Sequence, residues 1–314
     1  MASHDYQHHW LYAAGLVLEN PVGKSCIPLH TLYTCVFGEE TQKVGRGHLI
    51  RFKIVMAGRD CFQFVERSLD SVARQRDDAF DVCVVDDASE NLRQPDLMQD
   101  FCRDVGWSFI RNEDHRGALH NHVAAVQLMS PEPEDVIISV DADDRLSRPD
   151  ALTRVRGYYE LYQPLLTYGS YRCDPEDLRV QPAKHLPDEI VLTNAYRAFS
   201  AREDDPDPVW FNHLRTLKHH LFSRLDPSID FVHADGSWLK TCYDLAITIP
   251  ALELSAGRYL MLPDVLYIYT RDNPLSDCYV NEHITKEDKA RIFSLPPKQP
   301  LSEIVVPPRI EPLP

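Results

Sequence analysis

Three carboxylates lie close together in residues 141–144, directly after an apolar segment. Residues 136–140 are mostly apolar, as in a buried strand, and Asp141, Asp143 and Asp144 follow them. Side chains alternate along an extended chain, so Asp141 and Asp143 point to the same side. Such a pair can hold one hard divalent cation that is shared with phosphate oxygens. The pattern predicts a site for a nucleotide diphosphate; the alternative is an acidic turn in which Asp144 caps the element that follows.

A second apolar segment ends in the same way, because Asp86, Asp87 and Ser89 follow residues 80–85. Apolar residues at helical spacing separate the apolar segments, and this alternation predicts an α/β fold with a mostly parallel sheet. The loops that bind a ligand should gather at one edge of that sheet. The predicted strands cover 49–56, 80–85, 107–110 and 136–140, and the predicted helices cover 62–72 and 119–126.

The order of these motifs resembles the nucleotide-sugar-binding half of the family 2 glycosyltransferases of GT-A fold. The resemblance covers residues 50–170 and continues more loosely to Asp277. It implies a Rossmann-like, mostly parallel central sheet flanked by helices, and a soluble, metal-dependent, inverting enzyme that uses a nucleoside-diphosphate sugar. The shared motifs are Gly58-Arg59-Asp60, Asp86-Asp87-Ala88-Ser89, Arg116-Gly117 with Asn121, and Asp141-Ala142-Asp143-Asp144.

The resemblance assigns roles to these carboxylates by position. Asp86 would accept the imide N–H of a uracil-like base, with Asp87 as the second candidate. Asp141 would bind the ribose or lie near the metal, and Asp143 would ligate Mn²⁺ or Mg²⁺ that bridges the diphosphate. His283 is a candidate for a third metal ligand, although a single histidine in a polar segment is also an ordinary surface residue.

Other residues complete the predicted donor site. Arg116 and Arg271 have the planar group that suits phosphate oxygens, and the alternative for both is surface charge. The remaining predicted contacts to the nucleotide-sugar are Ala57, Arg59, Asp60 and Ala142.

Direct displacement at a sugar needs a general base that takes the proton from the acceptor hydroxyl. The resemblance places this base at Asp244, before an apolar segment of helical spacing that ends near Gly257, with Asp235 as the second candidate. Asp is also a favoured helix N-cap, which is the alternative role for Asp244. The family usually has an acidic residue before the base, where this chain has Tyr243. Pro250 should kink the helix.

The composition indicates a globular protein with a large core and argues against a nucleic-acid-binding surface. The chain has 314 residues, 44% of them hydrophobic, which is enough for a large core. Its net charge of -15 argues against a broad surface for polyanions such as nucleic acid. The eight cysteines form no Cys-x-x-Cys pair, which is typical of free thiols in a reducing compartment, so we expect a cytoplasmic protein.

The predicted organisation has four parts: an N-terminal extension (1–48), the nucleotide-sugar half (49–170), the acceptor half (171–294) and a Pro-rich tail (295–314). No apolar run approaches the ~20 residues that span a bilayer, so no membrane span is expected. In the acceptor half, the acidic loop at 201–208 could be a solvated segment or a lid. The segment 210–220 could contact sugars or form a core helix. The tail should lie extended over the surface or serve as an interaction tail.

The acceptor stays open: a glycan, a protein, a small molecule or a modified nucleic-acid base would leave the donor half unchanged. A nucleotidyltransferase is one alternative function, but it needs a longer Gly-rich basic loop than Ala57-Gly58-Arg59-Asp60. A non-catalytic carbohydrate-binding relative is the other alternative, because fold and function are separable.

Overall fold

The computed structural model describes residues 50–175, 179–202, 211–275 and 282–311. The described residues up to Arg309 belong to one compact unit, and strands from both predicted halves share one sheet. The predicted N-terminal extension and most of the acidic loop at 201–208 lie outside the described residues.

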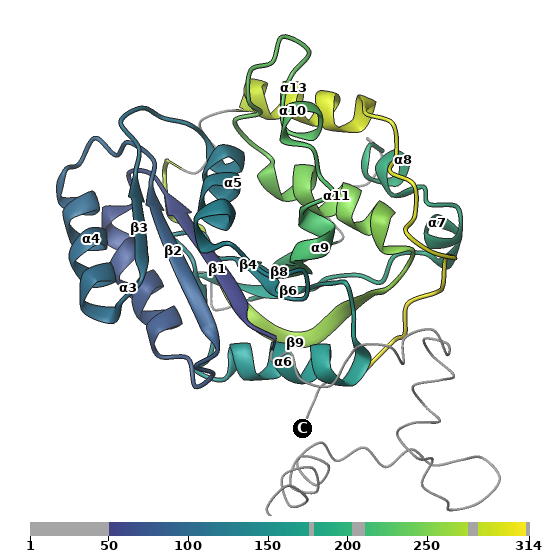
Figure 1. The fold of residues 1–314 in the computed structure, drawn as a ribbon, viewed down its shortest axis with the longest axis horizontal. Helices are drawn as coiled ribbons and strands as arrows, with labels where there is room; N and C mark the ends of the chain where they lie inside the picture. The colour runs from purple at the N-terminus through teal and green to yellow at the C-terminus, as the bar shows by residue number, and fades with distance from the viewer. Residues whose placement is uncertain (1–49, 176–178, 203–210, 276–281, 312–314) are drawn as a thin grey trace, which may run out of the picture. The chain divides into compact units, whose positions relative to one another are not determined.

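A nine-stranded mixed sheet runs through the described chain (Figure 1). In spatial order its strands are β3 (Ser108–Arg111), β2 (Phe80–Asp86), β1 (Phe52–Gly58), β4 (Val136–Ser139), β8 (Asn212–Lys218), β6 (Leu166–Asp174), β9 (Tyr259–Thr270) and β5 (Arg145–Leu146), and β7 (Val180–Gln181) pairs with β6. The first four strands are parallel, as the alternation of strands and helices predicts. β8 is antiparallel to β4 and β6, β9 is parallel to β6, and β5 is antiparallel to β9.

The helices cover both faces of this sheet, which is why the central strands are apolar on both sides. They are α3 (Phe62–Ala73), α4 (Arg93–Val105), α5 (Ala118–Met129), α6 (Ala151–Tyr162), α7 (Asp188–Leu192), α8 (Tyr196–Ser200), α9 (His219–Phe222), α10 (Pro227–Asp230), α11 (Tyr243–Ser255) and α13 (Glu282–Ser294). Helices α3 and α4 pack together beside one face, and α5 lies over β1 and β2 on the other, with α11 on the same side over β6 (Figure 1). In β1, Ile54, Val55 and Met56 are fully buried between these layers.

Two segments differ from the sequence prediction. A core helix was one of the two alternatives predicted for the segment 210–220. In the structure residues 212–218 form strand β8, and the helix α9 begins only at His219. β8 pairs with β4 and β6, and backbone pairing on both sides outweighs a weak helical spacing of side chains. Residues 93–105 form α4, a helix that the sequence did not predict, because few of its buried residues are apolar. The helix ends at Gly106, where φ is 79°.

The C-terminal end of α11 lies under the Pro-rich tail. The N–H groups of Leu301 and Val305 donate to the carbonyls of Leu254 (3.0 Å) and Ala256 (2.9 Å). At Gly257, φ is 79° and a Cβ would lie 1.7 Å from the Val305 carbonyl oxygen, so this position requires glycine. α11 itself is assigned as one helix through Pro250.

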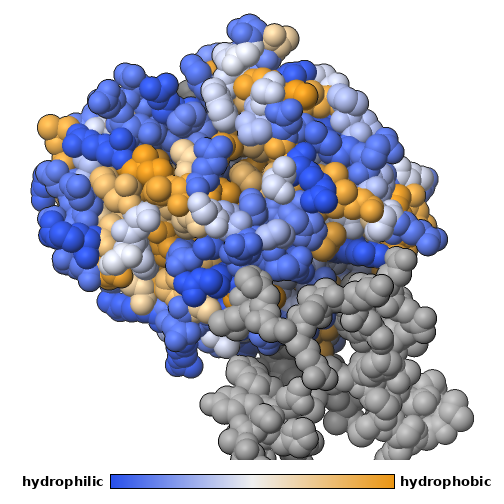
Figure 2. Space-filling model, in the orientation of Figure 1, coloured by the Kyte–Doolittle hydropathy of each residue, from blue (hydrophilic) through white to orange (hydrophobic). Residues whose placement is uncertain are grey.

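On the face shown in Figure 2, hydrophilic residues cover most of the described surface, and apolar residues gather mainly over β1 to β3. Among the described residues, no helix combines the length and the apolar character needed to cross a bilayer.

Candidate active site

The turn at residues 141–144 is locked to the first strand by a close backbone contact. The N–H of Ala142 donates to the carbonyl of Ala57 (3.0 Å), so the pairing of β1 with β4 continues into the turn. A Cβ on Gly58 would lie 2.5 Å from the Ala142 Cβ and 2.8 Å from the Cys61 Sγ. Glycine at position 58 therefore permits the approach that places the carboxylates at the edge of the sheet.

Each carboxylate of this turn is held by a group from the second half of the chain. The Tyr243 hydroxyl donates to Asp141 Oδ1 (2.7 Å) and the Asn273 amide donates to Asp143 Oδ2 (2.7 Å). The N–H of Thr270 donates to Asp144 Oδ1 (2.7 Å). Residues 243–273, in the predicted acceptor half, thus fix the orientation of all three side chains.

Crowding and burial make this turn electrostatically costly without a cation. Burial, and next the charge of Asp143, raise the pKa of Asp141 to about 7, against the opposing effects of the Tyr243 hydrogen bond and Arg215. Burial and the charges of Asp143 and Asp141 raise the pKa of Asp144 well above its ordinary value. Like charges at short range disfavour ionisation, and a bound cation would remove this penalty.

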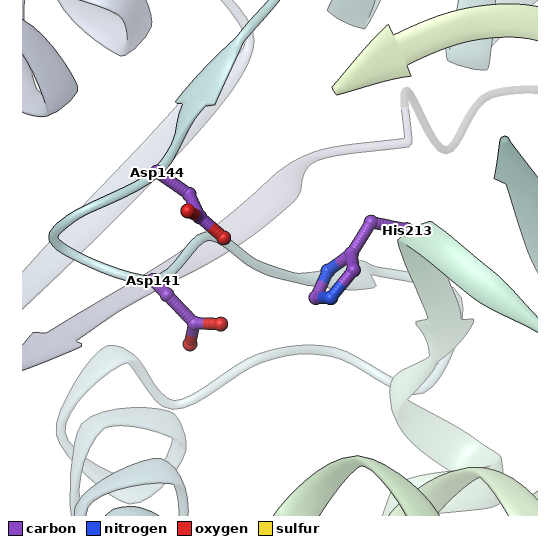
Figure 3. A group of neighbouring side chains, drawn as sticks. All are labelled: Asp141, Asp144 and His213. Atoms are coloured by element: carbon purple, nitrogen blue, oxygen red, sulfur yellow. The ribbon is translucent and has the colours of Figure 1, made fainter. Parts of the chain in front are cut away.

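One group of side chains in the described structure has the spacing of a metal site. Asp141, Asp144 and His213 each offer a ligand atom, and these atoms lie within 4.8 Å of one another. Figure 3 shows the two carboxylates and the imidazole turned toward a common space. Asp144 is 1% exposed, and its buried Oδ2 has no hydrogen-bond partner within 3.5 Å, although the nearby Tyr267 hydroxyl acts to lower the pKa of this carboxyl. Two carboxylates and an imidazole form a donor set that suits Mn²⁺, and the unpartnered oxygen fits a ligand role.

His213 enters this group from β8, a position that the sequence did not reveal. Burial, and then the neighbouring Arg215, keep the pKa of His213 well below its ordinary value, so the ring is neutral, as a metal ligand must be. The Arg215 guanidinium lies 2.8 Å from the ring Nε2 and 3.2 Å from Nδ1, so it donates to the one nitrogen of a neutral ring that has a free lone pair. A metal bound to that nitrogen would have to displace Arg215. The ring stacks on Tyr267 with centroids 4.4 Å apart.

The predicted ligands Asp143 and His283 are not members of this group. Asp143 lies in the same turn and contacts Asn273, whereas His283 is exposed near the start of α13. The sequence had pointed to His283 because it lies near the end of the catalytic region. The fold instead returns β8 beside β4, which brings His213 to the turn.

Asp244 lies in the first turn of α11, and its Oδ2 accepts a hydrogen bond from Arg215 (2.9 Å). Its neighbour Tyr243 reaches Asp141, so the predicted base and the predicted metal turn are joined through adjacent residues. Asp244 is not the N-cap of α11; that position is Cys242, and no side chain caps it. A cavity of about 20 Å³, the size of one water molecule, lies between Asp244 and the sheet. Its polar lining includes Ser139, Arg215, Thr216 and Tyr243.

Asp235, the second candidate for the base, lies in an exposed turn. Its Oδ1 accepts hydrogen bonds from the Ser237 N–H (2.9 Å) and hydroxyl (2.6 Å). This geometry is that of an ordinary Asp turn.

The two carboxylates after β2 bind neighbouring protein groups. Asp86 is 0% exposed, and its Oδ1 accepts from the Ser89 hydroxyl (2.6 Å) and the Gln94 amide (3.0 Å). Asp87 accepts from the backbone N–H groups of Arg116 and Gly117, both at 2.8 Å. Burial alone would raise the pKa of Asp87, but these hydrogen bonds and those of nearby amide side chains hold it below its ordinary value.

The remaining predicted donor contacts line the same edge of the sheet. Asp60, with φ 50°, accepts from the Glu90 N–H (2.7 Å), and Arg59 lies 3.4 Å from the Glu90 carboxylate. The Arg116 side chain is half exposed, and Arg271 is exposed after the end of β9. These arginines are accessible, as contacts to phosphate would require.

Sequence reasoning gave no role at this turn to six residues that contact the site: His213, Arg215, Tyr243, Tyr267, Thr270 and Asn273. It had suggested only contacts to sugars for the segment 210–220. Tyr243 was noticed only as a departure from the family pattern. The alternation of His213 and Arg215 in a strand was the available signal, since residues two apart point to the same side.

The fold and the site together define a GT-A glycosyltransferase architecture. Residues 54–221 match the model of glycosyl transferase family 2, which is more than half of the chain. The chain therefore belongs to glycosyl transferase family 2.

Solved structures of S. aureus TarS share this fold. TarS 1–349 in complex with UDP-GlcNAc has a TM-score of 0.57 at 16% identity, over 78% of this chain and 67% of that chain. TarS 1–349 has a TM-score of 0.53 at 18% identity, over 78% and 66% of the two chains. A further TarS structure has a TM-score of 0.52 at 18% identity. The match covers 76% of this chain but only 39% of that TarS chain. No curated protein sequence matches the chain.

Proposed function

We propose that the protein transfers a sugar from a nucleoside-diphosphate sugar to an acceptor hydroxyl. The observation that carries the proposal is the position of the turn 141–144. It lies at the carboxyl end of β4 within a family 2 domain, and it is joined to the first turn of α11 by the bond between Tyr243 and Asp141. Ligands of open α/β sheets bind at this edge. The same edge carries Asp86 and Asp87 at the end of β2.

The proposed cofactor is Mn²⁺ or Mg²⁺, held by Asp143 and Asp141, with Asp144 and His213 as further candidates. When bound, such an ion neutralises the charge that develops on the diphosphate leaving group. The residues of the chain supply the anionic cage and its orientation. The raised pKa values of Asp141 and Asp144 support this assignment, because their causes, burial first and neighbouring carboxylates second, are ones that a bound cation would offset.

The proposed stereochemical course is inversion with Asp244 as the base. Asp244 takes the proton of the acceptor hydroxyl while that oxygen forms a bond to the anomeric carbon. The bond from this carbon to the diphosphate breaks, and the nucleoside diphosphate leaves with the electron pair. Arg215 orients the carboxylate through its 2.9 Å hydrogen bond, and the 26% exposure of the Asp244 side chain leaves it reachable from solvent.

The proposed donor is a UDP-sugar. The likeness to TarS, whose structures include complexes with UDP-GlcNAc and UDP, supports this choice. Asp86 is proposed to read the base and Asp87 is the second candidate. Both already accept hydrogen bonds within the protein, so reading the base requires one of these bonds to be exchanged for the imide N–H.

The acceptor is proposed to be a glycan, a protein, a small molecule or a modified nucleic-acid base. A cytoplasmic location is proposed from the cysteines, since Cys61, Cys83, Cys102, Cys173 and Cys242 are free thiols in the described structure.

The decisive experiment is a donor screen by release of nucleoside diphosphate. UDP-, GDP- and CDP-sugars are tested with Mn²⁺, with Mg²⁺ and with excess chelator, for the wild-type protein and Asp143→Ala. We expect release from a UDP-sugar that needs the metal and is lost in Asp143→Ala. The variant should stay folded with a lower melting temperature, because the buried Asn273 amide loses its acceptor. Release that survives the chelator refutes the metal. Tight binding of a sugar without turnover of any donor points to a non-catalytic relative.

A further inference from the structure

The end of β9 lies against the turn 141–144. β5 pairs with β9 so that Arg145 is opposite Ile268 and Leu146 is opposite Tyr267. Extending this antiparallel register by two residues places Asp143 opposite Thr270. The residues after β9 are thus set beside the metal turn by strand pairing and not by a chance contact of loops.

Thr270 binds two residues of the turn at once. Its N–H donates to Asp144 Oδ1 (2.7 Å), and its hydroxyl donates to the carbonyl oxygen of Asp143 (2.5 Å). The same hydroxyl accepts from the Arg67 guanidinium (2.9 Å). A guanidinium can only donate, so Arg67 leaves the hydroxyl proton of Thr270 to Asp143. Thr270 is 1% exposed, and water does not compete for these bonds.

Asn273 holds the side chain of Asp143. Its Nδ2 donates to Asp143 Oδ2 (2.7 Å), and its Oδ1 accepts from the N–H of Leu275 (3.1 Å). The second bond fixes the amide, since the reversed orientation would place Nδ2 against a donor. Asn273 is 5% exposed. Its only polar task within the described contacts is to bridge the backbone after β9 to this one carboxylate.

We propose that Thr270 and Asn273 are positioning residues: Asn273 holds the carboxylate of Asp143, and Thr270 holds its backbone, so that Asp143 keeps the conformation that binds the divalent cation. The proposal rests on the proposed metal-dependent function. A carboxylate that is already held loses less conformational entropy when it ligates an ion. Groups that hydrogen-bond to metal ligands in this way usually change metal affinity by about 10- to 100-fold when they are removed.

The test is the affinity for Mn²⁺ in the presence of saturating UDP, measured by electron paramagnetic resonance of free Mn²⁺ and by titration calorimetry. These measurements do not depend on turnover or on the acceptor. For Asn273→Ala we expect Mn²⁺ affinity to fall by about 10-fold or more. Asn194→Ala is the matched control, because the Asn194 amide also donates to one oxygen, the carbonyl of Lys298 (2.9 Å). The control should lose stability and keep the wild-type Mn²⁺ affinity.

A second pair of variants keeps the proposal testable if Asn273→Ala does not fold. Thr270→Val preserves shape but removes the hydroxyl that binds Asp143, whereas Thr270→Ser keeps it. We expect Thr270→Val to weaken Mn²⁺ binding and Thr270→Ser to retain it. Equal Mn²⁺ affinity in wild type and Asn273→Ala, or in the two Thr270 variants, overturns the positioning role alone. Absence of Mn²⁺ binding by the wild-type protein overturns the metal-dependent function and this proposal with it.

Discussion

At the scale of single residues, the carboxylates at the end of β2 and those in the turn after β4 are held by different parts of the chain. Asp86 and Asp87 bind groups between residues 89 and 117, all within the predicted nucleotide-sugar half. Asp141 and Asp143 bind Tyr243 and Asn273, from the predicted acceptor half. Substitutions after β2 should therefore act on nucleotide binding, whereas substitutions after β4 should also disturb the contact between the halves.

Asp244→Asn tests the general base. Asparagine keeps the shape and can still accept a hydrogen bond from Arg215, but it cannot take up a proton at neutral pH. We expect transfer to fall by about 10²–10⁴-fold with nucleotide affinity unchanged. Rates of transfer, or of donor hydrolysis while the acceptor is unknown, are compared with UDP affinity from calorimetry. A loss of stability with a normal rate would instead assign a purely structural role to Asp244. Asp235→Asn is the control, since Asp235 lies in an exposed turn.

Asp86→Ala tests the reading of the base. Removal of a charged acceptor should weaken UDP binding by about 1.5–3 kcal/mol and reduce the preference for UDP over CDP and GDP. Ser89→Ala is the control, because it removes the hydroxyl that binds Asp86 and leaves the carboxylate in place. Calorimetric titration of the three nucleotides with Mn²⁺ measures both effects. A UDP preference that persists unchanged in Asp86→Ala would move the role to Asp87.

At the scale of elements, the site depends on the close approach of β1 to the turn after β4. The pairing of the two strands continues from Val140 to Ala142, whose N–H groups donate to Val55 and Ala57 at 3.0 Å each. Gly58 follows directly and has no room for a side chain. The backbone contacts with β1 therefore position the turn independently of the contacts that its carboxylates make.

Gly58→Ala should disturb the turn through this contact. The added methyl group would overlap the Ala142 Cβ, and relief requires the turn to move away from β1. We expect the free energy of unfolding to fall by about 1–3 kcal/mol, as is usual for overpacking, together with weaker Mn²⁺ and UDP binding. Gly169→Ala, in β6, is the control, since its Cβ would meet no atom closer than 3.4 Å. Urea unfolding and calorimetry measure the two effects, and wild-type binding by Gly58→Ala would contradict the packing argument.

At the scale of the whole molecule, the tail after α13 helps to hold the helix that carries Asp244. Beyond its backbone bonds to α11, the N–H of Lys298 donates to Glu253 (2.9 Å), which is 0% exposed and paired with Arg197. A buried ion pair is stable only while its hydrogen bonds are complete. The segment predicted as a surface tail is therefore part of the support of α11.

A double-mutant cycle tests the packing of the tail. The first change is Gly257→Ala and the second is deletion of residues 298–314. In the full chain, Gly257→Ala should lower the free energy of unfolding by more than the roughly 1–2 kcal/mol that alanine loses in a left-handed backbone conformation, because the methyl group also displaces Val305. In the shortened chain only the backbone cost remains, so the two changes should couple by about 0.5 kcal/mol or more. Urea unfolding measures all four proteins, and strict additivity would show that the tail does not press on Gly257.

The sequence by itself determined the class of fold and the edge that carries the chemistry. Apolar segments that end in Asp86 and Asp141 predicted strands whose carboxyl ends lie at the same edge of the sheet, and the strands β1 to β4 are parallel as expected. This much is local, because side-chain alternation and helical spacing act over a few residues. The resemblance to family 2 glycosyltransferases rested on the same motifs and is confirmed by the family match.

Only the tertiary structure decided which groups meet those carboxylates. The contact of Tyr243 with Asp141 joins positions 102 residues apart, and that of Asn273 with Asp143 joins positions 130 apart. The position of His213 beside the turn likewise depends on the pairing of β8 with β4. The sequence had allowed a helix in this segment. Such contacts depend on the order and direction of strands in the sheet, which no local pattern of residues encodes.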